Sequence, residues 1–144
     1  MPTAESILAR KGSEVATIDC NATILDAAKE MNERRIGALV VTSGDKAVGI
    51  FTERDVLIRV VAAGRDPKET KIEGVMTSPM AVCRRDTPMA ECRAVMTKKR
   101  IRHLPVVEEG KLYGIISSGD ILASEVEDQQ HTIEYLHEYL FAHR

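Results

Sequence analysis

One short motif whose residue types are suited to binding a nucleotide occurs twice in the chain. Residues 49–55 read GIFTERD and residues 114–120 read GIISSGD, so both contain a glycine, two apolar residues, a hydroxyl residue and an aspartate three positions later. An ionised aspartate has paired acceptor oxygens that can hold a vicinal diol. Thr52 and Ser117 can reach ribose or phosphate oxygens, and a glycine within a strand permits close approach of a ligand. The motif therefore indicates nucleotide binding.

The same motif also has a purely structural explanation. A hydroxyl residue followed three positions later by an acid is the pattern of a helix capping box, in which Thr52 pairs with Asp55 and Ser117 with Asp120. Capping accepts glutamate as readily as aspartate, yet both copies have aspartate. The start of a helix also attracts phosphate through its free N–H groups. Both explanations stay open at this stage.

The motif is part of a longer internal repeat. Residues 15–57 align with residues 80–122 without a gap, at a constant offset of 65. Identical pairs include Met31/Met96, Gly49/Gly114 and Asp55/Asp120. Repeats this short bury their apolar faces against each other rather than form independent cores. We therefore expect the functional clefts where the two copies meet.

Each copy predicts the order strand, helix, strand, strand, helix. In the first copy the predicted elements are a strand at 15–18, a helix that begins after Thr23, strands at 38–42 and 47–52, and a helix over 53–63. The first helix is capped by Thr23 and Asp26, and its apolar stripe consists of Ile24, Ala27, Ala28 and Met31. In the second copy they are a strand at 80–83, a helix with Thr87 as its N-cap and Pro88 as its first residue, strands at 103–107 and 112–117, and a helix from Ser118. The apolar stripe of the first of these helices consists of Met89, Cys92 and Met96. The linker between the copies covers 65–79.

Two segments lie outside the repeat. A short helix is predicted over 3–11, closed by Gly12, and a C-terminal helix over 125–143. The second carries a narrow stripe of Ile133, Leu136 and Leu140, which indicates docking either on its own domain or on a second subunit. Residues 125–138 contain five acids and no lysine or arginine, as expected of a solvated face.

Composition narrows the class of protein. A chain of 144 residues with 44% hydrophobic and 29% charged residues suits one globular domain. No apolar run approaches the length of a membrane span, and no hydrophobic stretch follows Met1, so neither a membrane segment nor a signal peptide is expected. A net charge of −2 and 3% aromatic residues argue against nucleic-acid binding. Three scattered cysteines without a C-x-x-C pair predict buried thiols in a cytoplasmic protein.

Taken together, these features resemble a tandem pair of cystathionine β-synthase (CBS) domains, also called a Bateman module. The resemblance covers about residues 10–124 and rests on both motifs, on RHLPVV at 102–107 and on VMT at 75–77, all in register with the repeat. The first copy departs from the pattern, because it has GALV at 37–40 where the second has RHLP. We divide the chain into a first repeat with its N-terminal extension (1–67), a second repeat (68–124) and a C-terminal helix (125–144).

The resemblance implies an α+β fold of two β-α-β-β-α units packed with pseudo-two-fold symmetry. It also implies two clefts for an adenosine-containing ligand: AMP, ADP, ATP, NAD(H) or S-adenosylmethionine. Members of the family commonly assemble as flat dimers and regulate another protein without catalysing a reaction. We therefore expect a homodimer that acts on a separate, unknown target.

The resemblance assigns residues to two composite sites. In the first site Asp120 binds the ribose hydroxyls, with Ser117 beside it, and Arg102 faces the phosphate. The adenine lies against Ile115 and against two residues of the other copy, Ala16 and Ile36. The second has Asp55 and Thr52, with Ala81 and Ile101 from the second copy. Arg54 stands where the second copy has Gly119, and a guanidinium there either forks onto a phosphate or fills the cleft.

Three other functions are weaker alternatives. The first alternative is an enzyme in which Asp55 and Asp120 act as general acid and base. The two aspartates are repeat equivalents and so have similar surroundings, whereas a catalytic acid–base pair needs surroundings that push the two pKa values apart. The sequence shows no Ser/His/Asp set or metal-ligand cluster. A ligand-free interaction module would depend on the C-terminal helix more than on the clefts. Nucleic-acid binding is less favoured than a ligand-free interaction module, and catalysis is the least favoured.

Overall fold

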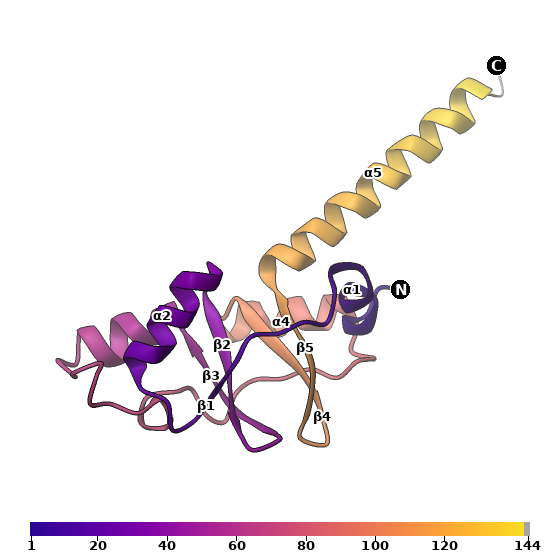
Figure 1. Ribbon diagram of the computed structural model, residues 1–144. Helices are drawn as coiled ribbons and strands as arrows, with labels where there is room; N and C mark the ends of the chain where they lie inside the picture. The colour runs from indigo at the N-terminus through magenta and orange to yellow at the C-terminus, as the bar shows by residue number, and fades with distance from the viewer. Residues whose placement is uncertain (143–144) are drawn as a thin grey trace.

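Each copy of the repeat forms its own small sheet in the computed structural model, which describes residues 1–142 (Figure 1). The first sheet has the order β1-β2-β3, with β1 (Thr17–Asp19) parallel to β2 (Ala38–Ser43) and β3 (Lys46–Thr52) antiparallel to β2. The second is an antiparallel pair of β4 (His103–Glu108) and β5 (Lys111–Ser117). The two hairpins lie side by side, and β3 contacts β5.

Helices precede, separate and follow these strands. They are α1 (Ala4–Lys11), α2 (Ile24–Arg34), α3 (Glu53–Asp55), the π-helix η1 (Val56–Val61), the 3₁₀-helix η2 (Ile72–Gly74), α4 (Met89–Lys99) and α5 (Ser118–Ala142). The α+β fold, the two repeats and the C-terminal helix are thus confirmed. None of the helices within residues 1–142 combines the length and the apolar character needed to cross a bilayer.

The repeat in sequence is a repeat in backbone geometry. Both hairpins have a register shift at the same repeat position, between Val41 and Thr42 in one copy and between Val106 and Val107 in the other. The helices α2 and α4 both end in an arginine of left-handed conformation, Arg35 with φ 54° and Arg100 with φ 56°.

The predicted local signals account for most of the elements. Thr23 and Asp26 form a reciprocal capping box at the start of α2, at 3.2 Å in each direction. The apolar stripes of α2 and α4 face the two cores, because Ile24, Ala27 and Met31 and their counterparts Met89, Cys92 and Met96 are all buried. Cys20, Cys83 and Cys92 are buried free thiols, as predicted.

The predicted strand at 80–83 is wrong. Only Cys83 makes an isolated parallel bridge, to Val106. The first copy shows the reason: there the Val40 amide donates to the Ala16 carbonyl at 3.1 Å, but the residue equivalent to Val40 is Pro105, which has no N–H to donate. The second sheet therefore has two strands where the first has three.

Four boundaries also differ from the predictions. The first strand is shifted to 17–19. The predicted helix over 53–63 begins as α3 and continues as a π-helix, closed by a bond of 2.9 Å from the Ala62 amide to the Leu57 carbonyl. Pro88, not Thr87, is the N-cap of α4, because the Thr87 hydroxyl accepts from the Arg84 amide instead. The helix after Ser118 and the C-terminal helix are one continuous element, and residue 143 lies outside the described residues.

Each core contains the segment that precedes the other copy. Ile7 and Leu8 of α1 belong to the core of the second copy, and Ile72 and Val75 of the linker belong to the core of the first. Backbone bonds fix both crossings, since the Ala4 amide donates to the Thr87 carbonyl at 2.9 Å and Thr77 exchanges two bonds with Ile50 at 2.9 and 3.1 Å. The copies are therefore interlocked by their leading segments.

Close contact at this crossing makes Gly49→Ala destabilising. A Cβ at Gly49 would lie 2.7 Å from Met76 Sδ and 2.9 Å from the Thr77 carbonyl oxygen, and the backbone oxygen cannot move aside cheaply. We expect a loss of about 1–3 kcal/mol of unfolding free energy in urea denaturation.

Gly74→Ala is the matched control, because a Cβ there meets nothing within 4 Å. Its unfolding free energy should change by no more than about 0.5 kcal/mol. Equal stability of the two variants would contradict the close crossing.

Candidate functional site

Both motif aspartates cap the helix in which they lie. Asp55 Oδ2 accepts from the Thr52 amide at 3.0 Å and from the Thr52 hydroxyl at 3.2 Å, while the Asp55 amide donates to that hydroxyl at 3.3 Å. Asp120 Oδ2 accepts from the Ser117 amide at 2.8 Å, and the Asp120 amide donates to the Ser117 hydroxyl at 3.1 Å. The structural explanation of the motif is therefore confirmed. It does not exclude a second role, because each carboxylate also has a partner from a distant segment.

Those distant partners come from the segments that interlock the copies. Lys11 Nζ, at the end of α1, donates to Asp120 Oδ2 at 2.6 Å and to the Ile115 carbonyl oxygen at 2.8 Å. The Thr77 hydroxyl donates to Asp55 Oδ1 at 3.2 Å. Lys11 and Thr77 lie just ahead of the first and the second copy, respectively. Each site is thus composite, with the aspartate of one copy facing the leading segment of the other.

The two aspartates differ in access to solvent. The Asp55 side chain is 10% exposed and has a further ion pair with Arg59, whose Nε lies 3.6 Å from Asp55 Oδ1. The Asp120 side chain is 22% exposed, and the side chain of its partner Lys11 is 29% exposed. The Asp120 site is therefore the more open of the two.

The charges around Asp120 keep its carboxyl ionised. Burial raises the pKa of Asp120, but the hydrogen bonds from Lys11 Nζ and the Ser117 amide, together with the Lys11 charge, outweigh burial and hold that pKa below its ordinary value. A charged carboxylate is the form that accepts two hydroxyl hydrogen bonds from a diol.

His103 lies where the two copies meet. A Cβ at Gly37 would be 3.2 Å from Glu53 Oε1 and 3.7 Å from His103 Cε1, so first-copy and second-copy side chains converge on this glycine. Burial lowers the pKa of His103; Glu53 and Asp120 oppose that shift, while Lys11 and Arg102 add to it. The net direction is a lowered pKa. His103 therefore lies near charged groups of the first copy, the second copy and α1.

The structure brings together only some of the predicted site residues. Ser117, Asp120 and Ile115 meet around Lys11, and Arg102 is exposed at the start of β4, its carbonyl accepting from the Ser118 amide at 2.9 Å. Ala16 and Ile36 pack against the core of the first copy, and Ala81 and Ile101 against that of the second. Arg54 is exposed. Whether any of them flanks an adenine stays a prediction.

Sequence reasoning missed Lys11 and Thr77 as site residues. Thr77 lies in the VMT motif, which marked the start of the second copy but not a partner of Asp55. Lys11 lies outside the repeat, at the register position of Met76, so the repeat gave no polar counterpart to compare with it.

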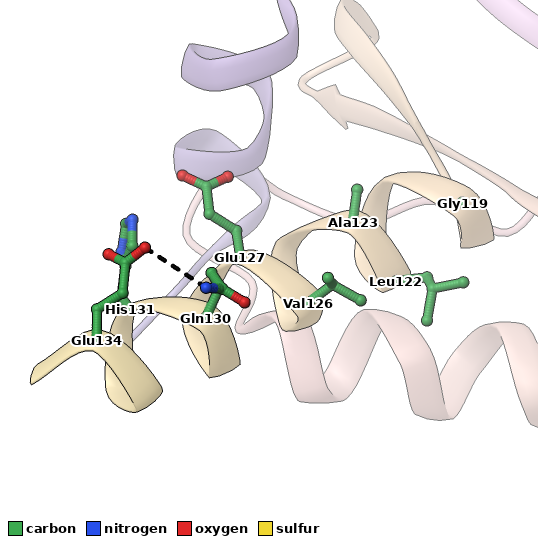
Figure 2. A pocket seen from close by; sticks show the side chains of 8 residues that line it. All are labelled: Gly119, Leu122, Ala123, Val126, Glu127, Gln130, His131 and Glu134. Carbon is green, nitrogen blue, oxygen red and sulfur yellow. Dashed lines mark hydrogen bonds between the residues drawn. The ribbon is translucent and has the colours of Figure 1, made fainter. Parts of the chain in front are cut away.

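Two hollows lie near these sites without including either aspartate. One of about 470 Å³ is lined by residues of α2, by Ile36 just beyond its end, by Glu53 of α3 and by Val56 of η1. The other, of about 610 Å³, runs along one side of α5 and is lined by α5 alone (Figure 2). Ile36 therefore borders a cavity next to the helix that carries Asp55.

Comparison with known proteins identifies the same two units. The family described as the CBS domain matches residues 6–62 and again residues 72–127. The CBS domain-containing protein CBSX3, mitochondrial, of Arabidopsis thaliana is 33% identical over 82% of this chain, which spans 60% of that relative's length. A protein with CBS domains from Burkholderia ambifaria is 42% identical, with a TM-score of 0.84 over 89% of this chain and 96% of its own.

An assembled relative is also known. The hexameric CBS-CP12 protein of bloom-forming cyanobacteria is 33% identical, with a TM-score of 0.73 over 84% of this chain and 70% of its own.

The lowered pKa of His103 predicts a loss of stability in mild acid. Because the folded chain holds the imidazole proton less tightly than the unfolded chain does, protonation favours unfolding as the pH falls below about 6.5, the ordinary histidine value. The loss continues down to the folded pKa and then levels off. Urea denaturation between about pH 7.5 and about pH 5 measures it.

In His103→Gln this part of the pH dependence should disappear, whereas His131→Gln, which removes an exposed histidine of α5, should keep it. An unchanged loss in His103→Gln would contradict the burial of this imidazole between the copies.

Proposed function

Because the chain belongs to the CBS-domain family and carries two copies of that domain, we propose that it is a regulatory module that binds an adenosine-containing ligand beside Asp120. The ligand classes that fit are those expected from the sequence: AMP, ADP, ATP, NAD(H) or S-adenosylmethionine. The module itself catalyses no reaction, and its target is a separate protein.

The observation that carries this proposal is the contact between Lys11 and Asp120. It pairs an ionised carboxylate with a flexible cation from another segment, next to the start of a helix. A ribose diol would replace Lys11 on the carboxylate, with its two hydroxyls donating to the two carboxylate oxygens. The first turn of α5 would then be available to a phosphate.

Local charge supports an anionic ligand. Seven cations and two acids lie between Arg84 and His103, and Arg102 and Lys11 both contribute to the potential at His103. Three of the seven, Arg93, Lys98 and Lys99, are exposed residues of α4. Arg102 differs because it lies at the start of β4, directly beside the helix end that carries Asp120.

We propose that the Asp55 site binds the same ligand more weakly. Its carboxylate is more buried and is held by Thr52, Thr77 and Arg59. A ligand would have to replace two of these partners and enter past an exposed arginine, Arg54. One bound ligand per chain is therefore expected at low concentration.

Regulation would follow from the position of α1. Its last two residues both attach α1 to α5, because Lys11 pairs with Asp120 and Arg10 pairs with Glu127. A ligand that removes Lys11 from Asp120 weakens one of the two attachments and so shifts the population of α1 positions. The free energy by which the ligand shifts this equilibrium equals its differential binding free energy for the two arrangements.

We also propose that the chain self-associates, as expected from the sequence. The hexameric relative supports assembly in this family, and exposed apolar side chains on α5 provide a surface for it.

Asp120→Asn tests the ligand site without removing the cap. The amide keeps one acceptor for the Ser117 N–H, but it loses the charge and one acceptor for the diol. We expect AMP, ATP or NADH to bind about 10- to 100-fold more weakly in isothermal titration, in line with the loss of a hydrogen bond to a charged group. Wild-type affinity with an unchanged melting temperature would return Asp120 to a capping role alone.

Lys11→Ala tests the competition. Removing a partly exposed ion pair should tighten AMP binding by about two- to fivefold, because the diol no longer displaces an ammonium. Lys29→Ala, which removes an exposed lysine of α2, is the matched control and should leave AMP affinity unchanged. Weaker AMP binding in Lys11→Ala would show that Lys11 holds the ligand and does not compete with it.

A further inference from the structure

The distal part of α5 is a helix without a covering surface. Residues 126–140 are all exposed, and Figure 1 shows the helix projecting away from the two sheets. The match to the CBS domain ends at residue 127, so most of this segment lies beyond the family fold. A helical segment of this length is marginal in water unless one of its faces packs against something. The expectation that it docks on its own domain is not met among the described residues.

One face of α5 has the spacing of a coiled coil. Positions 119, 122, 126, 129, 133, 136 and 140 are separated alternately by three and four residues, which is the a/d pattern of heptads. We call these seven residues the seam. Its aliphatic members are Leu122, Val126, Ile133, Leu136 and Leu140, which are 61, 55, 60, 49 and 61% exposed.

The residue types of the seam select the partner. Two of the four a positions have β-branched residues, Val126 and Ile133, and two of the three d positions have leucines, Leu122 and Leu136. β-Branched residues at a with leucine at d favour two parallel strands. Gln129 is the single polar side chain in the middle. In a parallel pair it meets Gln129 of the other helix, so the two amides satisfy each other. In an antiparallel pair with apolar layers opposite one another, Gln129 would face Ile133 of the other helix.

The charges of α5 lie off the seam. Glu127, Asp128, Glu134 and Glu138 occupy b, c and f positions, so two seams can meet without bringing these carboxylates into the contact. The body of the protein also leaves the seam open, since Ile121 and Ser124 are the buried residues of the first turns. Figure 2 shows Glu127 on the side of α5 toward α1, with Leu122 and Val126 on a different side.

We propose that α5 of one chain pairs with α5 of a second copy as a parallel two-stranded coiled coil along the seam. The contact spans residues 119–140, about 33 Å of helix. It deepens the proposed self-association by naming its surface, but it does not depend on ligand binding.

The available area sets the strength of this contact. Five aliphatic side chains, each 49–61% exposed, form the apolar contact on each helix, against roughly 20–30 residues a side in a standard stable interface. A stable interface buries about 800 Å² on each partner. The coil is therefore a reversible contact whose population rises with protein concentration.

Ile133→Asp tests the seam in the full chain. The substitution places a carboxylate in the middle of the apolar contact, where the second copy brings another. Sedimentation equilibrium should show the wild type passing from monomer to dimer with concentration and Ile133→Asp as a monomer at every concentration. Tyr135→Asp is the matched control, because Tyr135 is 66% exposed at a c position, off the seam, and it should dimerise like the wild type. A monomeric wild type, or dimerisation unaffected by Ile133→Asp, would overturn the proposal.

Leu136→Cys tests the direction of the two helices. In a parallel pair the two thiols share one layer and should oxidise to a covalent dimer, whereas in the antiparallel pair they would be about 15 Å apart, beyond the reach of a disulfide. The native cysteines are buried, so the introduced thiol is the exposed one. Glu138→Cys, at an f position, controls for random collision. Cross-linking in neither variant, or equally in both, would overturn the parallel arrangement.

Titration of Ile133→Asp with AMP separates this proposal from the ligand site. Wild-type affinity in a monomeric variant supports the seam and leaves the Asp120 site intact. A wild type that dimerises through the seam but binds no AMP would contradict the proposed function while supporting the seam.

Discussion

The pairing of each motif aspartate with the leading segment of the other copy is the contact on which the rest of the structure depends. Lys11 reaches Asp120 and Thr77 reaches Asp55, and each of them lies beside a crossing that also contributes apolar side chains to the opposite core. Neither copy therefore completes its own core or its own site. A repeat that duplicated a β-α-β-β-α unit has become one fold by exchanging these segments.

This exchange makes the two sites similar in plan but different in chemistry. Asp55 faces a neutral hydroxyl in a closed environment, while Asp120 faces an ammonium in a more open one. A neutral partner held by short backbone connections gives structural support. A charged partner at the end of a helix can leave when a ligand offers the carboxylate better hydrogen bonds. The asymmetry explains why we place the principal site at Asp120, and why α1 and α5 are the elements that would report its occupancy.

The sequence predicted the features that depend on short-range patterns, namely both hairpins, the capping boxes at Thr23, Thr52 and Ser117, and the apolar stripes of α2 and α4. The absence of a third strand from the second sheet could also have been predicted, because Pro105 lacks the N–H that Val40 donates in the first copy. The strand was predicted nevertheless, because the aligned segment of the first copy indicates one. Lys11 was not predictable, since its contact with Asp120 joins residues 109 positions apart and lies outside the repeat. The continuity of α5 was missed because the chain was divided at the end of the repeat, although no helix-ending residue lies between Asp120 and Glu125.

Hydrogen–deuterium exchange of the full chain with and without AMP tests whether the two copies share one ligand site. If they do, AMP changes exchange at two places together, around residues 9–13 at the end of α1 and around residues 114–121 at the end of β5 and the start of α5, with protection at the second. These segments are far apart in the sequence, and the Lys11–Asp120 pair that joins them spans 109 positions. A change confined to one of them, or to neither while AMP binds, would contradict a ligand site shared between the copies.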